Sequence, residues 1–199
     1  MKIAVWGAKG RVGSKVCEIA VTRRHTIFAV DKDNCASFDV PCDVVIDFSL
    51  PNCIEQIVKY CTTYKVPLVV GTTGHKDSQL ALLEKLKQRV PVIVKANYSK
   101  GMGIVSQICR EVAAQSNWDV TIVERHHKDK IDSPSGTAKM LANMLDCHNV
   151  LSVRAGNEFG THTIVFGGID ECIEITHRAT SVDIFALGAI ETAENLVGI

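Results

Sequence analysis

Short apolar runs alternate with amphipathic segments along the first half of the chain. The runs are KIAVWG, TIFAVD, DVVIDFS, PLVVGTTG and PVIVKAN, while residues 11–24, 51–64 and 78–88 carry apolar positions at helical spacing. Continuous apolar runs separated by amphipathic helices are typical of a parallel sheet that is covered by helices on both faces. The pattern therefore predicts a doubly wound α/β domain over residues 1–97.

The pattern changes after residue 97. A helix is predicted over residues 102–115, followed by the strand DVTIVER, the helix TAKMLANML and three strands around LSVRA, THTIVFG and ECIEITHRA. The last two strands are joined by GGID, a hairpin signal that favours an antiparallel or mixed sheet. We therefore expect a smaller α+β domain over residues 98–181, and a helical stretch over residues 182–199 that completes the first domain.

The composition of the chain argues against several classes of binding partner and site. The chain has 199 residues with 22 basic and 22 acidic side chains, so no field of one sign attracts nucleic acid or a membrane surface. No apolar run is long enough for a signal peptide or a membrane span, and we expect a cytoplasmic protein. The eight cysteines form no C-x-x-C pair, which favours packed, reduced thiols over disulfides or a metal site.

Three glycines, Gly7, Gly10 and Gly13, follow the first strand at G-x-x-G-x-x-G spacing. In a Rossmann-like fold such glycines make a tight turn, let the backbone approach a pyrophosphate and permit close helix packing. Asp31 ends the second strand eighteen residues beyond Gly13, where this fold places the carboxylate that binds the adenosine ribose. A carboxylate repels the 2′-phosphate of NADPH and the adjacent Lys32 attracts it, so NADH and NADPH both remain candidates. The alternative is an ordinary strand-to-helix turn.

A polar block, ERHHKDKIDSPSGTA, covers residues 124–138. Because neighbouring strand residues point to opposite sides, His126 and His127 are not both core residues, and Lys130 follows them in a loop. A single buried structural histidine is the alternative, which a histidine pair followed by lysine makes less favourable. Adjacent histidines without a spaced cysteine or carboxylate fit no usual ligand pattern, so we expect no metal site.

The same block ends with the start of a helix. Ser135 is placed to cap it, Gly136 leaves room beside the backbone, and Thr137 adds a hydroxyl next to the free amides. Such a helix end binds carboxylate or phosphate, although a capped helix without a ligand is the alternative. Together with the histidines and the lysine, it indicates a small anionic substrate that is reduced by hydride while a proton is supplied.

These blocks resemble one enzyme family. ERHHKDKIDSPSGTA is similar to the signature of the 4-hydroxy-tetrahydrodipicolinate reductases, also called dihydrodipicolinate reductases, of bacterial and plant lysine biosynthesis. GAKGRVG, DVVIDFSLP, GTTG, ANYSKGMGI, VRAGN, GTHTIVF and EITHRATS also resemble that family's blocks, in the same order and over most of the chain. The resemblance implies that NADH or NADPH reduces a cyclic imine dicarboxylate, with loss of water, to tetrahydrodipicolinate.

The resemblance also implies roles for individual residues. His126 and Lys130 would handle the proton, with the lysine as the favoured donor, while His127, Gly136 and Thr137 would hold the substrate carboxylate. The residues implied to hold the coenzyme are Gly7, Gly10, Arg11, Val12, Gly13, Asp31, Gly71, Thr72, Thr73, Ala96, Asn97 and Tyr98. The implied partner is a small dicarboxylate, and the family's sheet in the second domain implies a homotetramer.

Two segments are shorter than the family's usual pattern. Only eleven residues separate Asp31 from Asp43, barely enough for a parallel crossover, and only DCHNVLS lies between the helix ending near Leu145 and VRAGN. Val182 and Gly103 stand where arginine and asparagine are common. These departures bear on coenzyme affinity and substrate fit. Two alternatives therefore stay open: another Rossmann-type imine or carbonyl acid reductase, and a catalytically impaired NAD(P)-binding protein.

Overall fold

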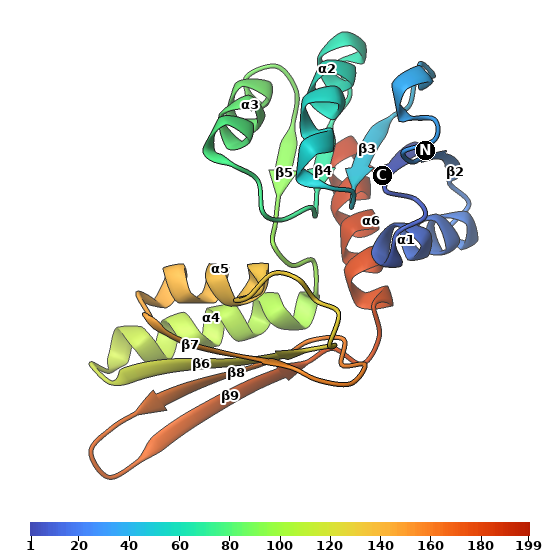
Figure 1. Cartoon of the computed structure of the whole chain (residues 1–199). Coiled ribbons are helices and arrows are strands. Elements are labelled where there is room, and N and C mark those ends of the chain that lie inside the picture. Colours follow the sequence, from blue (N-terminus) through green and yellow to red (C-terminus); the bar gives the residue numbers. More distant parts are fainter. The chain divides into compact units, whose positions relative to one another are not determined.

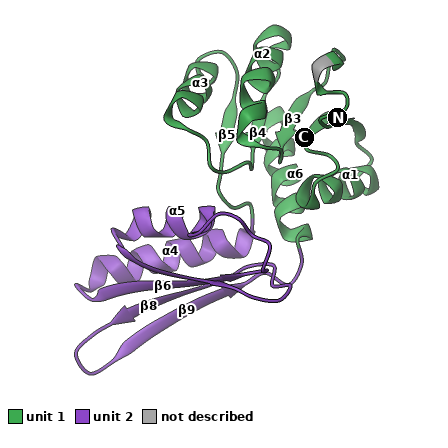
Figure 2. Cartoon of the chain, in the orientation of Figure 1, with its two compact units in different colours: residues 1–98, 182–199 green, residues 99–181 purple. Residues whose placement is uncertain are grey.

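The computed structural model describes the backbone of residues 1–199 and every side chain except that of Ala36. The chain divides into two compact units (Figure 2). The first unit holds Met1–Tyr98 and Val182–Ile199, and the second holds Ser99–Ser181. The first unit is thus built from both ends of the chain, because the C-terminal segment supplies its last helix.

The first unit contains a five-stranded parallel sheet in the order β2-β1-β3-β4-β5 (Figure 1). Its strands are β1 (Lys2–Trp6), β2 (Thr26–Val30), β3 (Val44–Asp47), β4 (Leu68–Val70) and β5 (Val92–Val94). Its helices are α1 (Arg11–Thr22), α2 (Ile54–Tyr64), α3 (Asp77–Lys87) and α6 (Asp183–Val197), with short 3-10 turns η1 (Cys35–Ser37) and η2 (Pro51–Cys53). The predicted α/β class is confirmed, and the strand order changes direction between β1 and β3.

Helices cover both faces of this sheet, because alternate strand residues point to opposite sides. Val5 and Ile46 pack on the side of α1 and α6, which lie next to each other in Figure 1. Val45 and Leu68 pack on the side of α2 and α3. All four side chains are fully buried, and each such aliphatic side chain contributes roughly 1.5–3 kcal/mol. This double layer holds the carboxyl ends of the strands in fixed positions.

The link between β2 and β3 contains no α-helix. β2 and β3 lie on opposite sides of β1, and residues 31–43 connect them through turns and η1. The Tyr60 hydroxyl on α2 donates to Val40 O at 2.5 Å, and the Trp6 and Phe38 rings pack edge to face with centroids 5.2 Å apart. Aromatic packing therefore holds a crossover that is too short to contain a covering helix.

The second unit contains a four-stranded mixed sheet in the order β7-β6-β8-β9. Its strands are β6 (Asp119–His126), β7 (Asn149–Arg154), β8 (Thr161–Gly167) and β9 (Cys172–Arg178), and its helices are α4 (Lys100–Gln115) and α5 (Gly136–Leu145). β6 and β7 are parallel and joined through α5, whereas β8 runs antiparallel to both β6 and β9. The predicted mixed sheet and the hairpin between its last two strands are confirmed.

Both helices of the second unit cover the same face of its sheet (Figure 1). Ile122, Ile164 and Phe166 point to that face and are fully buried. The strand residues that alternate with these point to the other face. On that face, Leu151 and Val153 keep 52% and 41% of their surface exposed. No described element of this unit covers that face, which is called the open face below.

The start of α2 and the boundary at Tyr98 differ from the prediction. The helix predicted from Pro51 begins with the 3-10 turn η2, and α2 starts only at Ile54; 3-10 turns are frequent at the N-termini of α-helices. Tyr98, predicted as the first residue of the second domain, belongs to the first unit. Its ring packs in the core shared with Val69, and its hydroxyl donates to Val70 O at 2.8 Å.

Candidate functional site

The turn between β1 and α1 lies at the carboxyl edge of the parallel sheet, where the strand order changes direction. Gly7 has a φ of +79°, and a Cβ placed on it would lie 2.4 Å from Phe48 O. A Cβ on Gly13 would lie 2.1 Å from Gly7 O. Gly10 precedes α1 and provides no side-chain cap. The first turn of α1 therefore presents backbone amides without a side-chain acceptor, an arrangement that binds phosphate.

The first two residues of α1 complete this loop in different ways. Arg11 is exposed at the first helical position, next to the open amides. Val12 is partly buried and packs against the core of the first unit. Arg11 thus has an exposed guanidinium at this helix end, whereas the side chain of Val12 belongs to the core.

Asp31 follows β2 alongside the glycine loop. Its Oδ2 accepts a hydrogen bond from Lys9 N at 2.9 Å and its Oδ1 accepts one from Lys32 N at 2.9 Å. These backbone hydrogen bonds lower the pKa of the Asp31 carboxyl, so it is ionised at neutral pH. The Lys9 ammonium pairs with Asp33. The carboxylate predicted to bind ribose is therefore anchored to the loop predicted to bind phosphate.

The GTTG segment follows β4 at the same edge. A Cβ on Gly71 would lie 2.1 Å from Cε1 of Phe48, so only glycine fits beside that ring. Thr72 is buried beside Asp47, the last residue of β3. Burial raises the pKa of the Asp47 carboxyl, and hydrogen bonds to Ser49 and Thr72 oppose that shift. A buried carboxyl and a buried hydroxyl therefore lie together at the edge where such sheets bind ligands.

The remaining predicted coenzyme residues lie in the loops after β4 and β5. Thr73 is exposed, and Ala96 and Asn97 are partly buried. Tyr98 differs from them because it is buried and its hydroxyl is already bonded within the fold. The loops after β1, β2, β4 and β5 therefore bring the predicted coenzyme residues to one edge of the first sheet.

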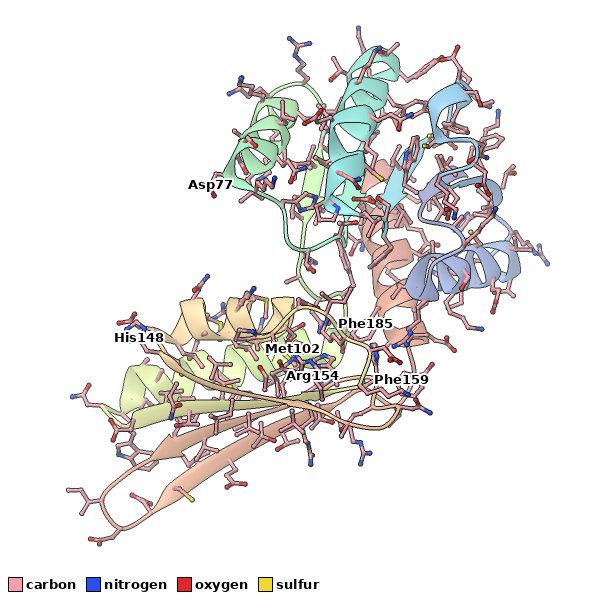
Figure 3. The ribbon with its side chains drawn as sticks, viewed as in Figure 1. Asp77, Met102, His148, Arg154, Phe159 and Phe185 are labelled. Atoms are coloured by element: carbon pink, nitrogen blue, oxygen red, sulfur yellow. The ribbon has the colours of Figure 1, made fainter. Side chains whose placement is uncertain are left out.

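The second unit places His126 at the end of β6, on the face covered by helices. Its Nδ1 lies 2.5 Å from Glu124 Oε2, and the fully buried Glu124 also pairs with Arg154, which is labelled in Figure 3. Burial favours a higher pKa for Glu124, but hydrogen bonds led by Arg154 lower the pKa to about 2. Burial lowers the pKa of His126, while Glu124 opposes that shift. The result is a neutral imidazole bonded to an ionised carboxylate.

Lys130 lies in the loop that follows His126. Its ammonium is 2.5 Å from Asp132 Oδ1, and Asp132 Oδ2 accepts a hydrogen bond from Gly136 N at 3.2 Å. One carboxylate thus bridges the lysine and the first residue of α5. Because a side-chain carboxylate fits between these groups, their spacing also suits the carboxylate of a small substrate.

Ser135 caps α5, as predicted. Its Oγ accepts a hydrogen bond from Ala138 N at 3.2 Å and lies 3.2 Å from His162 Nε2. Burial lowers the pKa of His162 to about 3, so this ring is neutral. Thr137 follows in the first turn and is buried. The carboxylates of Glu124 and Asp132 accept hydrogen bonds from Ser135 N and Gly136 N, as expected of a helix end that attracts an anion.

His127 is the residue that follows β6. It is partly buried, and its backbone N–H donates to Glu158 O at 2.9 Å. Among the residues predicted to act on the substrate, Lys130 and Gly136 are joined through the carboxylate of Asp132. His126 is linked to the same helix start through Glu124, which also accepts a hydrogen bond from Ser135 N at 3.1 Å.

Four polar residues of this site were missed from the sequence: Glu124, Asp132, Arg154 and His162. Glu124 stands two residues before His126 in a strand, so the alternation rule places both on one face and was a usable signal. Arg154 comes from the neighbouring strand β7, where it pairs in register with His126. That register is not visible in the sequence pattern.

Comparison with known proteins assigns the family. A model described as dihydrodipicolinate reductase, N-terminus, matches residues 1–98, and one described as dihydrodipicolinate reductase, C-terminus, matches residues 101–198. The chain belongs to the dihydrodipicolinate reductase family. A 4-hydroxy-tetrahydrodipicolinate reductase of Thermosipho africanus is 38% identical and covers 98% of this chain and 90% of the relative. That of Clostridium tetani is 30% identical and covers 100% of this chain and 92% of the relative.

The Clostridium alignment runs over 235 residues, although this chain has 199. That member of the family therefore carries residues that this chain lacks. Among solved structures, a dipicolinate-bound dihydrodipicolinate reductase from Paenisporosarcina sp. TG-14 superposes with a TM-score of 0.74 at 21% identity, covering 100% of this chain and 95% of that one. This likeness shows the shared fold.

Among the described residues, no group of three or more histidine, cysteine, aspartate or glutamate side chains is placed to hold a metal ion. In the same part of the chain, no helix combines the length and apolar character needed to cross a membrane.

Proposed function

We propose that this protein catalyses the NAD(P)H-dependent reduction of 4-hydroxy-tetrahydrodipicolinate to tetrahydrodipicolinate in lysine biosynthesis. The substrate, NAD(P)H and a proton give the product, NAD(P)⁺ and water. The observation that carries this proposal is the bridge from Lys130 through a carboxylate to Gly136, beside His126. In a member of this family, such a bridge supports binding of a dicarboxylate next to a proton donor.

The two units hold the two reactants. The glycine loop, Asp31 and the GTTG segment of the first unit hold the dinucleotide, which supplies hydride when bound. In the second unit, Gly136 and Thr137 at the start of α5, together with His127, hold a substrate carboxylate. Lys130 delivers the proton, and His126 accepts or returns protons at the same site.

A coupled assay tests the proposal. The unstable substrate is generated in place from pyruvate and aspartate semialdehyde by the preceding synthase, and oxidation of NADH or NADPH is followed at 340 nm. Oxidation that depends on both precursors is expected. A chain that binds NADH but oxidises none would instead be a catalytically impaired binding protein, and oxidation with other imine or carbonyl acids alone would indicate a different reductase.

We propose Asp31 as the residue that disfavours NADPH. Its ionised carboxylate repels a 2′-phosphate, so Asp31→Asn is expected to raise the ratio of kcat/KM for NADPH to that for NADH by roughly fivefold, equivalent to about 1 kcal/mol. Asp43→Asn is a matched control, because Asp43 also accepts a backbone N–H, from Lys2 at 2.6 Å, at the opposite edge of the sheet. An unchanged ratio in Asp31→Asn would contradict this role.

We also propose a homotetramer assembled through the open face of the second sheet. This face exposes Leu151 and Val153 beside the partly buried Val123 and Val165. Leu151→Asp combined with Val153→Asp is expected to lower the mass measured by light scattering, because charges are costly in an apolar interface. Leu50→Asp, at a 64% exposed leucine of the first unit, should leave the mass unchanged. A monomeric wild type would contradict the proposal.

A cytoplasmic location is proposed as well. The eight cysteines are all free thiols, and free thiols are typical of a reducing compartment. The NAD(P)H-dependent reaction proposed above suits the same compartment.

A further inference from the structure

A buried carboxylate lies behind the groups proposed to act on the substrate. Glu124 has no exposed surface, yet its two oxygens serve three neighbours. Oε1 accepts from Arg154 Nη2 at 2.6 Å and from Ser135 N at 3.1 Å. Oε2 accepts from Arg154 Nη1 at 2.9 Å and lies 2.5 Å from His126 Nδ1. All four contacts lie within the second unit.

The pairing with Arg154 already satisfies the charge of Glu124. The guanidinium binds both oxygens in a fork, which is the strongest geometry for such a pair. Arg154 Nη2 also donates to Asp132 O at 2.7 Å, so it is anchored on both sides. The contacts of Glu124 to His126 and Ser135 are therefore additional to a complete ion pair, and they call for a separate explanation.

The contact to His126 determines where the ring carries its proton. A carboxylate only accepts hydrogen bonds, so Nδ1 must bear the hydrogen, and in the neutral ring Nε2 then has a free lone pair. Nε2 lies on the side of Gly160, where an added Cβ would be 2.9 Å away. The glycine, at a φ of +141°, leaves space at the atom that would exchange a proton.

The contact to Ser135 links the same carboxylate to the start of α5. Ser135 caps the helix through its side chain, and its backbone N–H is held by Glu124. The next amide, Gly136 N, is the one bonded to Asp132. One buried side chain therefore sets both the imidazole of His126 and the anion-binding end of the helix.

We propose that Glu124 is a positioning residue, which holds His126 in the Nδ1–H tautomer and in alignment with the first turn of α5. It acts through His126 and Ser135 rather than by touching the substrate. The proposal rests on the proposed function, because it concerns the same reaction site.

Histidine ring NMR on the full chain, without substrate, tests the tautomer directly. In long-range ¹H–¹⁵N spectra at neutral pH, His126 is expected as the Nδ1–H form in the wild type and as a mixture, or the Nε2–H form, in Glu124→Gln. Glu194→Gln is a matched control, since Glu194 also pairs with an arginine and a histidine, Arg23 at 2.6 Å and His25 at 2.8 Å. An Nε2–H form of His126 in the wild type would overturn the proposal.

Kinetics in two backgrounds test whether Glu124 acts through His126. Glu124→Gln is expected to lower kcat roughly 10- to 100-fold, as loss of an orienting partner does elsewhere, with a smaller change in KM. In a His126→Ala background the same substitution should change kcat by less than about threefold, because coupled residues are not additive. An equal loss in both backgrounds would reduce Glu124 to a structural role.

A second variant keeps the test decisive if Glu124→Gln leaves Arg154 buried without its partner and fails to fold. Glu124→Gln combined with Arg154→Met removes both charges, and the same tautomer change is expected. Failure of the proposed function would appear separately, as a wild type that oxidises no NAD(P)H. In that case the NMR result on His126 still decides the role of Glu124.

Discussion

Replacing Lys130 with alanine is expected to lower kcat by about 10²- to 10⁴-fold, the usual contribution of a positioned general acid. The Lys130 side chain is only 22% exposed, and Asp132 Oδ1 holds its ammonium at 2.5 Å. A water molecule that entered the space left by alanine would lack both the positive charge and the fixed position of this ammonium. NADH binding should be retained, because the proposed dinucleotide residues lie in the first unit. The coupled assay measures kcat, and fluorescence titration measures the Kd for NADH.

Two further substitutions separate proton donation from charge. Lys128→Ala removes an exposed lysine from the same loop and should leave kcat near the wild-type value. Lys130→Arg keeps the positive charge, but an arginine side chain does not release a proton at neutral pH, so kcat should remain low. Wild-type turnover in Lys130→Ala would remove the lysine from the mechanism, and recovery in Lys130→Arg would assign it an electrostatic role only.

Replacing Gly13 with alanine is expected to destabilise the first unit and to abolish tight NADH binding. The added Cβ would lie 2.1 Å from Gly7 O, and a backbone atom cannot move aside as a flexible side chain can. Overpacking of this kind costs about 3 kcal/mol at the upper end of its usual range, which corresponds to a fall in Tm of roughly 6–12 °C for a chain of this size. Thermal unfolding and calorimetric titration with NADH measure the two effects.

Gly103 provides the control, because a Cβ there meets nothing within 4 Å. It lies inside α4, where alanine is favoured over glycine by roughly 0.5–1 kcal/mol. Gly103→Ala should therefore raise Tm slightly and leave NADH affinity unchanged. If Gly13→Ala bound NADH as well as the wild type, the glycine loop would not be the dinucleotide site.

Much of the fold follows from local patterns. The runs that became β1, β3 and β4 are continuous and apolar because helices cover both faces of their sheet, and the GGID signal marked the β8–β9 hairpin correctly. The start of α2 was less predictable: Pro51 signals a helix start, but the geometry of its first turn depends on the packing around it. The short link between β2 and β3 was visible as a length, whereas the Trp6 and Phe38 contact that holds it was not.

By itself, the sequence determined the α/β class, the glycine loop, the Ser135 cap and the block containing His126 and Lys130, because each depends on residues close together in the chain. Only the tertiary structure decided the partners of those residues. Arg154 reaches Glu124 across 30 positions, and His162 reaches Ser135 across 27. Such pairs depend on strand register and burial. Burial of Glu124 makes an ion pair between β6 and β7 necessary, and the register of the two strands places the Arg154 guanidinium against that carboxylate.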